Sequence, residues 1–157
     1  MALIKSLNNL NPIIAADVFL ADNATIIGDV SIAKGSSVWF NSTIRGDVNS
    51  IVIGNNVNIQ DGVVVHCTYQ KTNTVIGNNV SIGHNAIIHG CKIEDNVLIG
   101  MGAIIMDGAL IQKNSIVAAG SIVTKNTLVP SGSVFAGLPA KLIRTISEEE
   151  IYDLTQN

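Results

Sequence analysis

The chain contains three histidines, His66, His84 and His89, and these are the side chains best suited to bind a metal ion. Imidazole is the commonest metal ligand among protein side chains. Three imidazoles with a fourth position left open form the zinc sites of several enzymes. The spacing between His84 and His89 matches no standard metal-binding motif. A shared site therefore depends on where the surrounding elements place each ring.

Composition excludes several classes of protein. The length of 157 residues suits a single domain, residues 1–157. The chain is 47% hydrophobic and 13% charged, and its net charge of −3 argues against a nucleic-acid partner. Two cysteines make no disulfide framework. No signal peptide and no apolar run long enough for a bilayer is recognisable, so we expect a cytoplasmic protein without a membrane partner.

An aliphatic residue recurs with a spacing of almost always six residues. The residue two positions earlier is usually small or β-branched, and the residue three positions later is usually Gly, Asn or Asp. Positions two apart share one face of a strand, and Gly, Asn and Asp adopt positive φ at low cost. The pattern predicts short strands with a corner after every six residues, at positions that include Asp29, Asn41, Asp47 and Asn56. The aliphatic positions are Leu20, Ile26, Ile32, Val38, Ile44, Ile53, Ile59, Val65, Ile76, Ile82, Ile88, Ile93, Ile99, Ile105, Ile111, Val117, Val123, Val129 and Phe135.

Three strands with three corners close into a triangular coil, and stacked coils bury ladders of Val and Ile. This pattern resembles the hexapeptide-repeat proteins, which implies an all-β, left-handed parallel β-helix. We expect its coils over residues 17–136 and an exit segment over residues 137–146. Ser147 and Glu150 have the spacing of a capping box, which predicts a short C-terminal helix over residues 147–157. A β-sandwich would not explain so constant a period.

The repeat breaks at three places that fall on the same corner of successive coils. The steps from Ile44, Val65 and Ile88 to the next aliphatic position are nine, eleven and five residues long. The residues that follow them directly are Arg45, His66 and His89, which should stack along one edge. Adjacent coils lie about 4.8 Å apart, so the two imidazoles can lean onto one ion.

His84 falls on the preceding corner, where Asp61 holds the same position one coil earlier. One face of the prism spans roughly 15 Å, so His84 cannot easily share a metal with His66 and His89 of its own chain. A neighbouring chain can supply it. A cyclic trimer satisfies this arrangement three times by symmetry.

Plainer interpretations exist for each of these residues. A single exposed histidine is ordinarily a surface residue, or it could be the base of an acyltransferase. Arg45 and Asp47 could form a solvated ion pair worth at most about 1 kcal/mol, or they could set the register at a subunit boundary. We interpret Cys67 and Cys91 as structural thiols.

Several short motifs occur in an order and spacing that resemble the γ-class carbonic anhydrases over nearly the whole chain. The motifs are Arg45-Gly46-Asp47, Asn58-Ile59-Gln60-Asp61-Gly62, His66, Gly83-His84, His89-Gly90-Cys91 and Gly100-Met101-Gly102. The resemblance implies a homotrimer with Zn²⁺ between subunits. It also implies the reversible hydration of carbon dioxide to bicarbonate by a metal-bound hydroxide, a lyase reaction. Three imidazoles would also accept Fe²⁺ or Co²⁺.

The resemblance assigns a role to each matching residue. His66 and His89 match metal ligands from one chain, and His84 matches the ligand from the next. Gln60 matches a catalytic residue that orients the reacting water, and Asp61 matches its catalytic neighbour, which supports the metal site. Arg45 and Asp47 match an intersubunit salt bridge.

The chain departs from the active family members at two acidic positions. Val48 stands where they carry a glutamate near the reacting water, and residues 67–74 contain no acid where they carry a proton-shuttle glutamate. The tail stops at Asn157, whereas many relatives have a longer C-terminal helix that adds another active-site polar group, and Tyr152 is not an obvious replacement for it.

Two other functions stay open. One is an acyl-CoA-dependent acyltransferase or thioesterase, because the fold hosts both. The other is a catalytically weak metal-binding scaffold trimer, which the missing glutamates favour.

Overall fold

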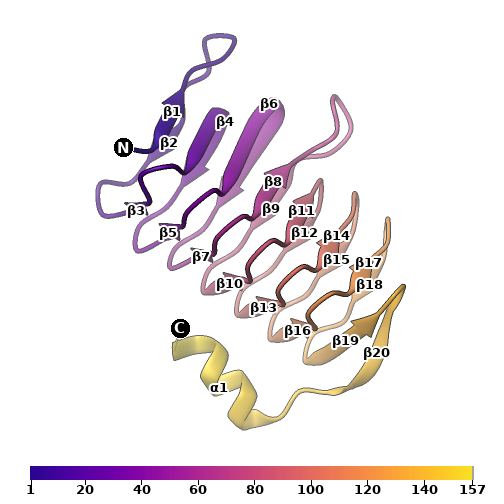
Figure 1. The fold of residues 1–157 in the computed structure, drawn as a ribbon. Helices are drawn as coiled ribbons and strands as arrows, with labels where there is room; N and C mark the ends of the chain where they lie inside the picture. Colours follow the sequence, from indigo (N-terminus) through magenta and orange to yellow (C-terminus); the bar gives the residue numbers. More distant parts are fainter. Residues whose placement is uncertain (157) are drawn as a thin grey trace.

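Short parallel strands stacked in three faces make up most of the chain in the computed structural model, which describes residues 1–156 (Figure 1). The first face contains β1 (Leu3–Lys5), the first half of β4 (Thr25–Ile32), the first half of β6 (Thr43–Ile53), β8 (Val64–His66), β11 (Ile87–His89), β14 (Ile104–Ile105) and β17 (Ile122–Val123). The second face contains β2 (Ile13–Ile14), the second halves of β4 and β6, β9 (Thr74–Ile76), β12 (Lys92–Ile93), β15 (Leu110–Ile111) and β18 (Leu128–Val129).

The third face is a separate sheet of eight strands. It contains β3 (Phe19–Leu20), β5 (Ser37–Val38), β7 (Asn58–Ile59), β10 (Val80–Ile82), β13 (Val97–Ile99), β16 (Ser115–Val117), β19 (Ser133–Gly137) and β20 (Ala140–Thr145). Every strand before β20 pairs in parallel with the strand one coil away, as in β10 with β13. The predicted fold class, an all-β, left-handed parallel β-helix with one short C-terminal helix, is confirmed.

The interior consists of the two predicted ladders of side chains. Ile59, Ile82 and Ile99, which follow one another along the stack, are each 0% exposed. Burying one such side chain contributes about 1.5–3 kcal/mol, so the stack of aliphatic rungs supplies most of the hydrophobic stabilisation. The smaller ladder two positions earlier is also buried, including the serines Ser42 and Ser115. Their hydroxyls donate to main-chain carbonyls, so burial leaves neither unsatisfied.

Asparagines and glycines share the corners because both accept positive φ. Asn56, Asn79, Asn96 and Asn114 have φ between 53° and 57°. They also stack, since the side-chain amide of each donates to the side chain of the next at 3.0–3.1 Å. Asp29 and Asp47 differ from the expected corner residues in one respect, because neither has positive φ, which falls on Gly28 ahead of Asp29. Instead β4 and β6 continue round the edge from the first face to the second, with a register shift at Gly28.

Both ends of the prism contain more structure than the repeat indicated. The N-terminal strands β1 and β2 already pair with β4, ahead of residue 17. At the other end, the expected exit segment turns back at Leu138 and forms β20, which pairs antiparallel with β19.

The C-terminal helix α1 (Glu148–Gln156) lies beside the third face (Figure 1). The predicted capping box is present: the Glu150 amide donates to the Ser147 hydroxyl at 3.2 Å, and the Ser147 amide donates to the Glu150 carboxylate at 3.0 Å. Leu154 is buried in a small cluster with Val134 and Ile146. Within residues 1–156 no helix has the length and apolar character needed to cross a bilayer.

Replacing Ser147 by alanine should loosen the helix α1. The variant removes the side chain that accepts from the Glu150 amide, and loss of such a cap typically costs about 1 kcal/mol. Hydrogen exchange of the α1 amides should accelerate about fivefold while exchange in the coils stays unchanged. Glu149→Gln, in the same helical turn but outside the box, serves as the control. Equal exchange in Ser147→Ala and the parent would contradict the capping role.

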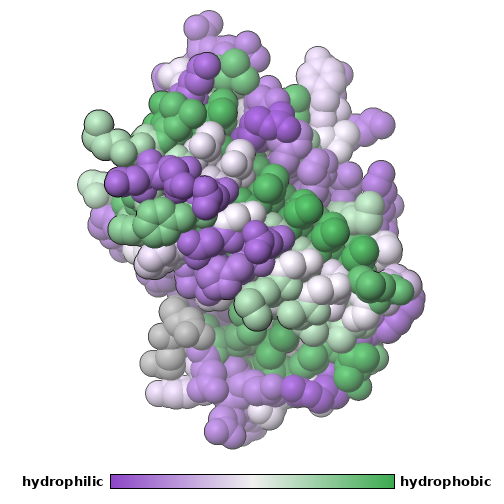
Figure 2. Space-filling model, in the orientation of Figure 1, coloured by the Kyte–Doolittle hydropathy of each residue, from purple (hydrophilic) through white to green (hydrophobic). Residues whose placement is uncertain are grey.

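The outward side chains of the strands are not uniformly polar. Figure 2 shows apolar side chains in a diagonal band that follows the stack of coils. Outward-facing Val52, Val64, Ile87 and Leu128 are 43%, 39%, 37% and 52% exposed. The β-helix therefore presents apolar surface on its first and second faces.

Candidate metal centre

His66 and His89 end two adjacent strands, β8 and β11, and are register partners in the parallel pair. This is the stacking that the breaks in the repeat predict. The rings meet edge to face with centroids 5.1 Å apart. The Nδ1 atom of His66 lies 3.1 Å from the Nε2 atom of His89. Neighbouring coils thus bring two imidazole nitrogens to one point at the edge between the first and second faces.

A carboxylate holds the outer nitrogen of each ring. Asp47 Oδ1 lies 2.8 Å from His66 Nε2, and Asp107 Oδ1 lies 3.0 Å from His89 Nδ1. Burial opposes ionisation of both acids, but hydrogen bonds from the histidines and other donors outweigh it, so the pKa of Asp47 and the pKa of Asp107 lie below the usual value. Both groups are therefore carboxylates at neutral pH and can only accept hydrogen bonds.

The two carboxylates determine which ring nitrogens carry protons. His66 Nε2 and His89 Nδ1 must be the donors, so in the neutral rings His66 Nδ1 and His89 Nε2 carry lone pairs. The two nitrogens lie at the 3.1 Å separation of a hydrogen bond, so a single proton between them, or a metal ion in its place, would satisfy both lone pairs. Two ligands on a tetrahedral zinc lie about 3.4 Å apart, given bonds of about 2.1 Å. The pair therefore fits a metal after a small opening of the rings.

His84 lies on a different edge, in the corner between β10 and β11. Its Nδ1 atom pairs with Asp61 Oδ2 at 3.0 Å, which leaves Nε2 available as a ligand. In residues 1–156 no group of three His, Cys, Asp or Glu side chains could hold a metal within one chain. The separation of His84 from the other two histidines follows the prediction from the repeat.

Gln60 lies beside His84 rather than beside the histidine pair. Both residues line a cavity of about 240 Å³ together with Trp39, Asn58 and Asp61. Gln60 and His84 also border a more apolar hollow of about 420 Å³ next to Met101. A neighbouring chain that brought its own histidine pair to His84 would find Gln60 at the same place.

Arg45 and Asp47 form an ion pair with each other at the histidine edge. One oxygen of Asp47 accepts from Arg45 Nη1 and the other accepts from His66. Asp47 therefore has a direct role in orienting a histidine, which the sequence interpretation missed. The role of both residues across a subunit boundary stays a prediction.

Val48 and the acid-free loop line one polar cavity beside Asp47. The cavity has a volume of about 460 Å³ and includes Val48, Tyr69 and Asn73 in its lining. Its other acidic residue is Asp29. The loop between β8 and β9 extends beyond the edge of the prism (Figure 1). Tyr152 lies on α1 and is 63% exposed.

Asp107 is the functional candidate that sequence reasoning missed altogether. Its oxygen Oδ1 accepts from His89 Nδ1 and from the hydroxyls of Thr68 and Thr72, each at 3.0 Å. The repeat register held a signal for it, because Ile105 pairs with Ile88 and so places this acid one coil beyond His89. No pattern in the sequence singles out the two threonines.

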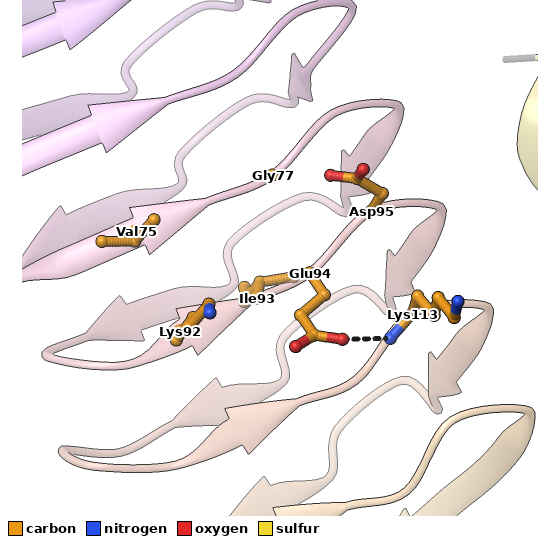
Figure 3. Close-up of a pocket in the computed structure, with 7 residues that line it drawn as sticks. All are labelled: Val75, Gly77, Lys92, Ile93, Glu94, Asp95 and Lys113. Carbon is orange, nitrogen blue, oxygen red and sulfur yellow. Dashed lines mark hydrogen bonds between the residues drawn. The ribbon is translucent and has the colours of Figure 1, made fainter.

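Among residues 1–156, the two thiols are poor candidates for a competing centre. Burial raises the pKa of Cys67, and it raises the pKa of Cys91 to about 12, so both thiols are poor nucleophiles. A cavity of about 260 Å³ on another edge is lined by Lys92, Glu94 and Lys113, and the Lys113 amide donates to Glu94 at 3.1 Å (Figure 3). Its lining carries both signs of charge.

Two family models match the repeats. They are the bacterial transferase hexapeptide (six repeats), over residues 73–106, and the hexapeptide repeat of succinyl-transferase, over residues 90–125. Among solved structures, a hexapeptide transferase family protein from Anaplasma phagocytophilum is 43% identical, with a TM-score of 0.94 over 98% of this chain and 90% of that chain. A putative acetyltransferase from Bacillus cereus is 39% identical, with a TM-score of 0.96 over 99% of this chain and 90% of that chain.

Several relatives are named carbonic anhydrases. Gamma carbonic anhydrase 2, mitochondrial, of Arabidopsis thaliana is 48% identical over 154 residues, or 94% of this chain. This chain spans 55% of the length of that relative. A probable carbonic anhydrase of Methanocaldococcus jannaschii is 50% identical over 144 residues, which cover 92% of this chain and 90% of that protein. With its hexapeptide coils and a relative of this identity along nearly its full length, the chain belongs to the γ-class carbonic anhydrase-like family of hexapeptide-repeat proteins.

Proposed function

We propose that the protein is a metal-dependent lyase that hydrates carbon dioxide reversibly to bicarbonate at sites shared between the subunits of a homotrimer. One observation carries the proposal. The imidazole nitrogens His66 Nδ1 and His89 Nε2 converge at 3.1 Å, and a carboxylate holds each ring from behind. Relatives named carbonic anhydrase support the assignment of this chemistry.

The metal would be held by His66 and His89 of one chain and by His84 of the next. Zinc suits three imidazoles, and Fe²⁺ or Co²⁺ would also fit them. When bound, the metal lowers the pKa of coordinated water to about 7 and so supplies a nucleophile at neutral pH. Asp47 and Asp61 each hold a ligand ring in one tautomer and one orientation. Such outer hydrogen bonds commonly improve metal affinity by about 10–100-fold.

Gln60 would orient the reacting water, because its amide lies in the same cavity as His84. We expect the product proton to leave through the polar cavity beside Asp47, whose carboxylate contacts His66. Val48 and the loop after His66 bring no glutamate to that cavity. We therefore expect chemistry at the metal to outpace the removal of the proton.

The chain should be a trimer in solution. His84 lies on another edge from the His66/His89 pair, and the apolar side chains of Val64 and Ile87 lie on the same strands as the pair, 39% and 37% exposed. Contact between subunits would cover this apolar surface and complete the site. Light scattering should give three times the chain mass of 16.5 kDa. A monomer that still binds zinc tightly would rule out the shared site.

An acyl-CoA-dependent transferase is the second candidate, because solved relatives at 43% and 39% identity are described as transferases. Such an enzyme needs one histidine base and a groove for coenzyme A, and it needs no metal. Metal analysis of the purified protein, with carbon dioxide hydration measured beside an acyl-CoA assay, separates the two. Bound metal with hydration supports the lyase. Acyl transfer by metal-free protein, without hydration, would overturn it.

A further inference from the structure

One oxygen of Asp107 joins the loop after β8 to a candidate metal ligand. Asp107 Oδ1 accepts from His89 Nδ1, Thr68 Oγ1 and Thr72 Oγ1, each at 3.0 Å. The two threonines lie 39 and 35 residues away from the acid in sequence. The side chain of Asp107 is 20% exposed. A single, largely shielded carboxylate therefore orients the histidine and holds the loop.

The backbone around this carboxylate leaves room for all three donors. Gly90 follows His89 at φ +57°, and a Cβ atom there would lie 2.0 Å from Asp107 Oδ1 and 2.2 Å from Thr72 Oγ1. The absence of a side chain at Gly90 therefore lets acid and hydroxyl approach each other. From the other side, the Asn49 amide donates to the carbonyls of Thr68 and Thr72 at 2.8 and 2.9 Å. The loop is thus held at both its hydroxyls and its carbonyls.

This arrangement couples the loop to the metal site in both directions. A metal on His89 Nε2 would fix the ring and strengthen Nδ1–H as a donor to Asp107. A fixed carboxylate in turn is a better acceptor for the two hydroxyls, since linked hydrogen bonds polarise one another. Coupling between two binding events is reciprocal by thermodynamic necessity. If metal stabilises the loop contacts, the loop contacts must stabilise the metal.

We propose that Asp107 is a positioning residue through which metal binding at His89 and the order of the loop over residues 67–73 stabilise each other. The proposal rests on the metal site proposed above. It assigns a role to Thr68 and Thr72, whose hydroxyls donate to the carboxylate that holds His89. It also explains why a loop without acids is still tied closely to the histidine edge.

Thr68→Val is the most direct probe, because it keeps the side-chain shape and removes one hydroxyl whose partner is Asp107. Zinc affinity, measured by competition with a chelator, should fall about fivefold or more. Asp107→Ala should weaken zinc binding about 10–100-fold, and Asp107→Asn, which keeps an acceptor oxygen, should recover part of it. The Co²⁺ absorption spectrum should change in Asp107→Ala. Thr124→Val, in a later turn where Thr124 and Thr127 bond to each other, is the matched control and should leave zinc affinity unchanged.

Hydrogen exchange tests the reciprocal half of the proposal. Zinc should slow exchange of the loop amides in the parent protein by about fivefold or more, and Asp107→Ala should abolish that effect. Thr68→Val combined with Asp107→Ala should bind zinc no more weakly than Asp107→Ala alone, because both changes break one network. Two results would reject the coupling without touching the proposed function. One is additive losses of zinc affinity in the double variant, and the other is loop exchange that zinc does not slow in a parent protein that binds zinc. A parent that binds no zinc would overturn both this inference and the proposed function. If Asp107→Ala misfolds, the zinc affinity of Thr68→Val and the effect of zinc on loop exchange in the parent protein still test the coupling.

Discussion

Mixed trimers made by refolding a His84→Ala chain together with a His66→Ala/His89→Ala chain should regain zinc binding that neither variant has alone. Each homotrimer lacks part of every site, so its zinc affinity should fall at least about 100-fold, beyond the loss from an outer hydrogen bond. In a mixed trimer, one chain supplies His84 and its neighbour supplies the pair. With random assembly in equal amounts, about one quarter of the parent number of sites is restored.

Metal analysis after gel filtration measures this result directly. Each variant refolded by itself, at the same total concentration, is the control for incomplete removal of free zinc. Mixed trimers without zinc, beside a parent that binds it, would show that the site is not shared between chains. Full zinc binding by the His84→Ala homotrimer would show that His66 and His89 suffice with other ligands.

Carbon dioxide hydration should be slow at low buffer and should rise with buffer concentration. The reason is the cavity beside Asp47, where Val48 and the loop provide no glutamate to carry the proton away. General acid–base help of this kind contributes about 10²–10⁴-fold. Val48→Glu should therefore raise the rate at low buffer, up to the lower end of that range, and flatten the buffer dependence.

Val52→Glu is the matched control, because Val52 lies on the same strand β6 but on the second face and is 43% exposed. It adds the same charge away from the cavity and should leave the buffer dependence unchanged. A fast rate that does not respond to buffer in the parent would contradict the prediction, and Asp29, which lines the same cavity, would be the next residue to replace. No hydration at high buffer with full metal occupancy would favour the scaffold or transferase alternatives.

The sequence alone determined the repeat, and through it most of the fold. Side chains alternate with a period of two within each strand, and a corner comes every six residues. A triangular coil is the simple fold that satisfies both, and the buried Ile59, Ile82 and Ile99 are successive rungs of one of its ladders. Counting repeats also located the histidines. His66 and His89 are register partners and His84 pairs with Asp61 on the other edge, because register in stacked coils is a property of spacing.

The corners near Asp29 and Asp47 show what counting leaves out, because the chain turns from the first face to the second there without positive φ at either aspartate. The same turn-forming residue types stand there as elsewhere, yet β4 and β6 run on around the edge. Whether a corner interrupts the strand or lets it run on around the edge depends on its pairing with the neighbouring coil. The conformational preference of a single residue carries no information about that pairing. Gly28 and Gly46 lie side by side there, and a Cβ on either would collide with the other strand within 2.3 Å.

Only the tertiary structure decided which side chains hold each histidine ring by hydrogen bonds. Asp47 was expected to pair with Arg45, and it also holds His66 at 2.8 Å. Asp107 and the threonines Thr68 and Thr72 were not singled out, although together they orient His89 and hold the loop. Strand register can be counted from the six-residue repeat. The hydrogen bond between Thr68 and Asp107, which are 39 residues apart, depends instead on the path of an irregular loop and on side-chain rotamers. Those are fixed by packing between coils, where the absence of a side chain at Gly90 leaves space for the carboxylate.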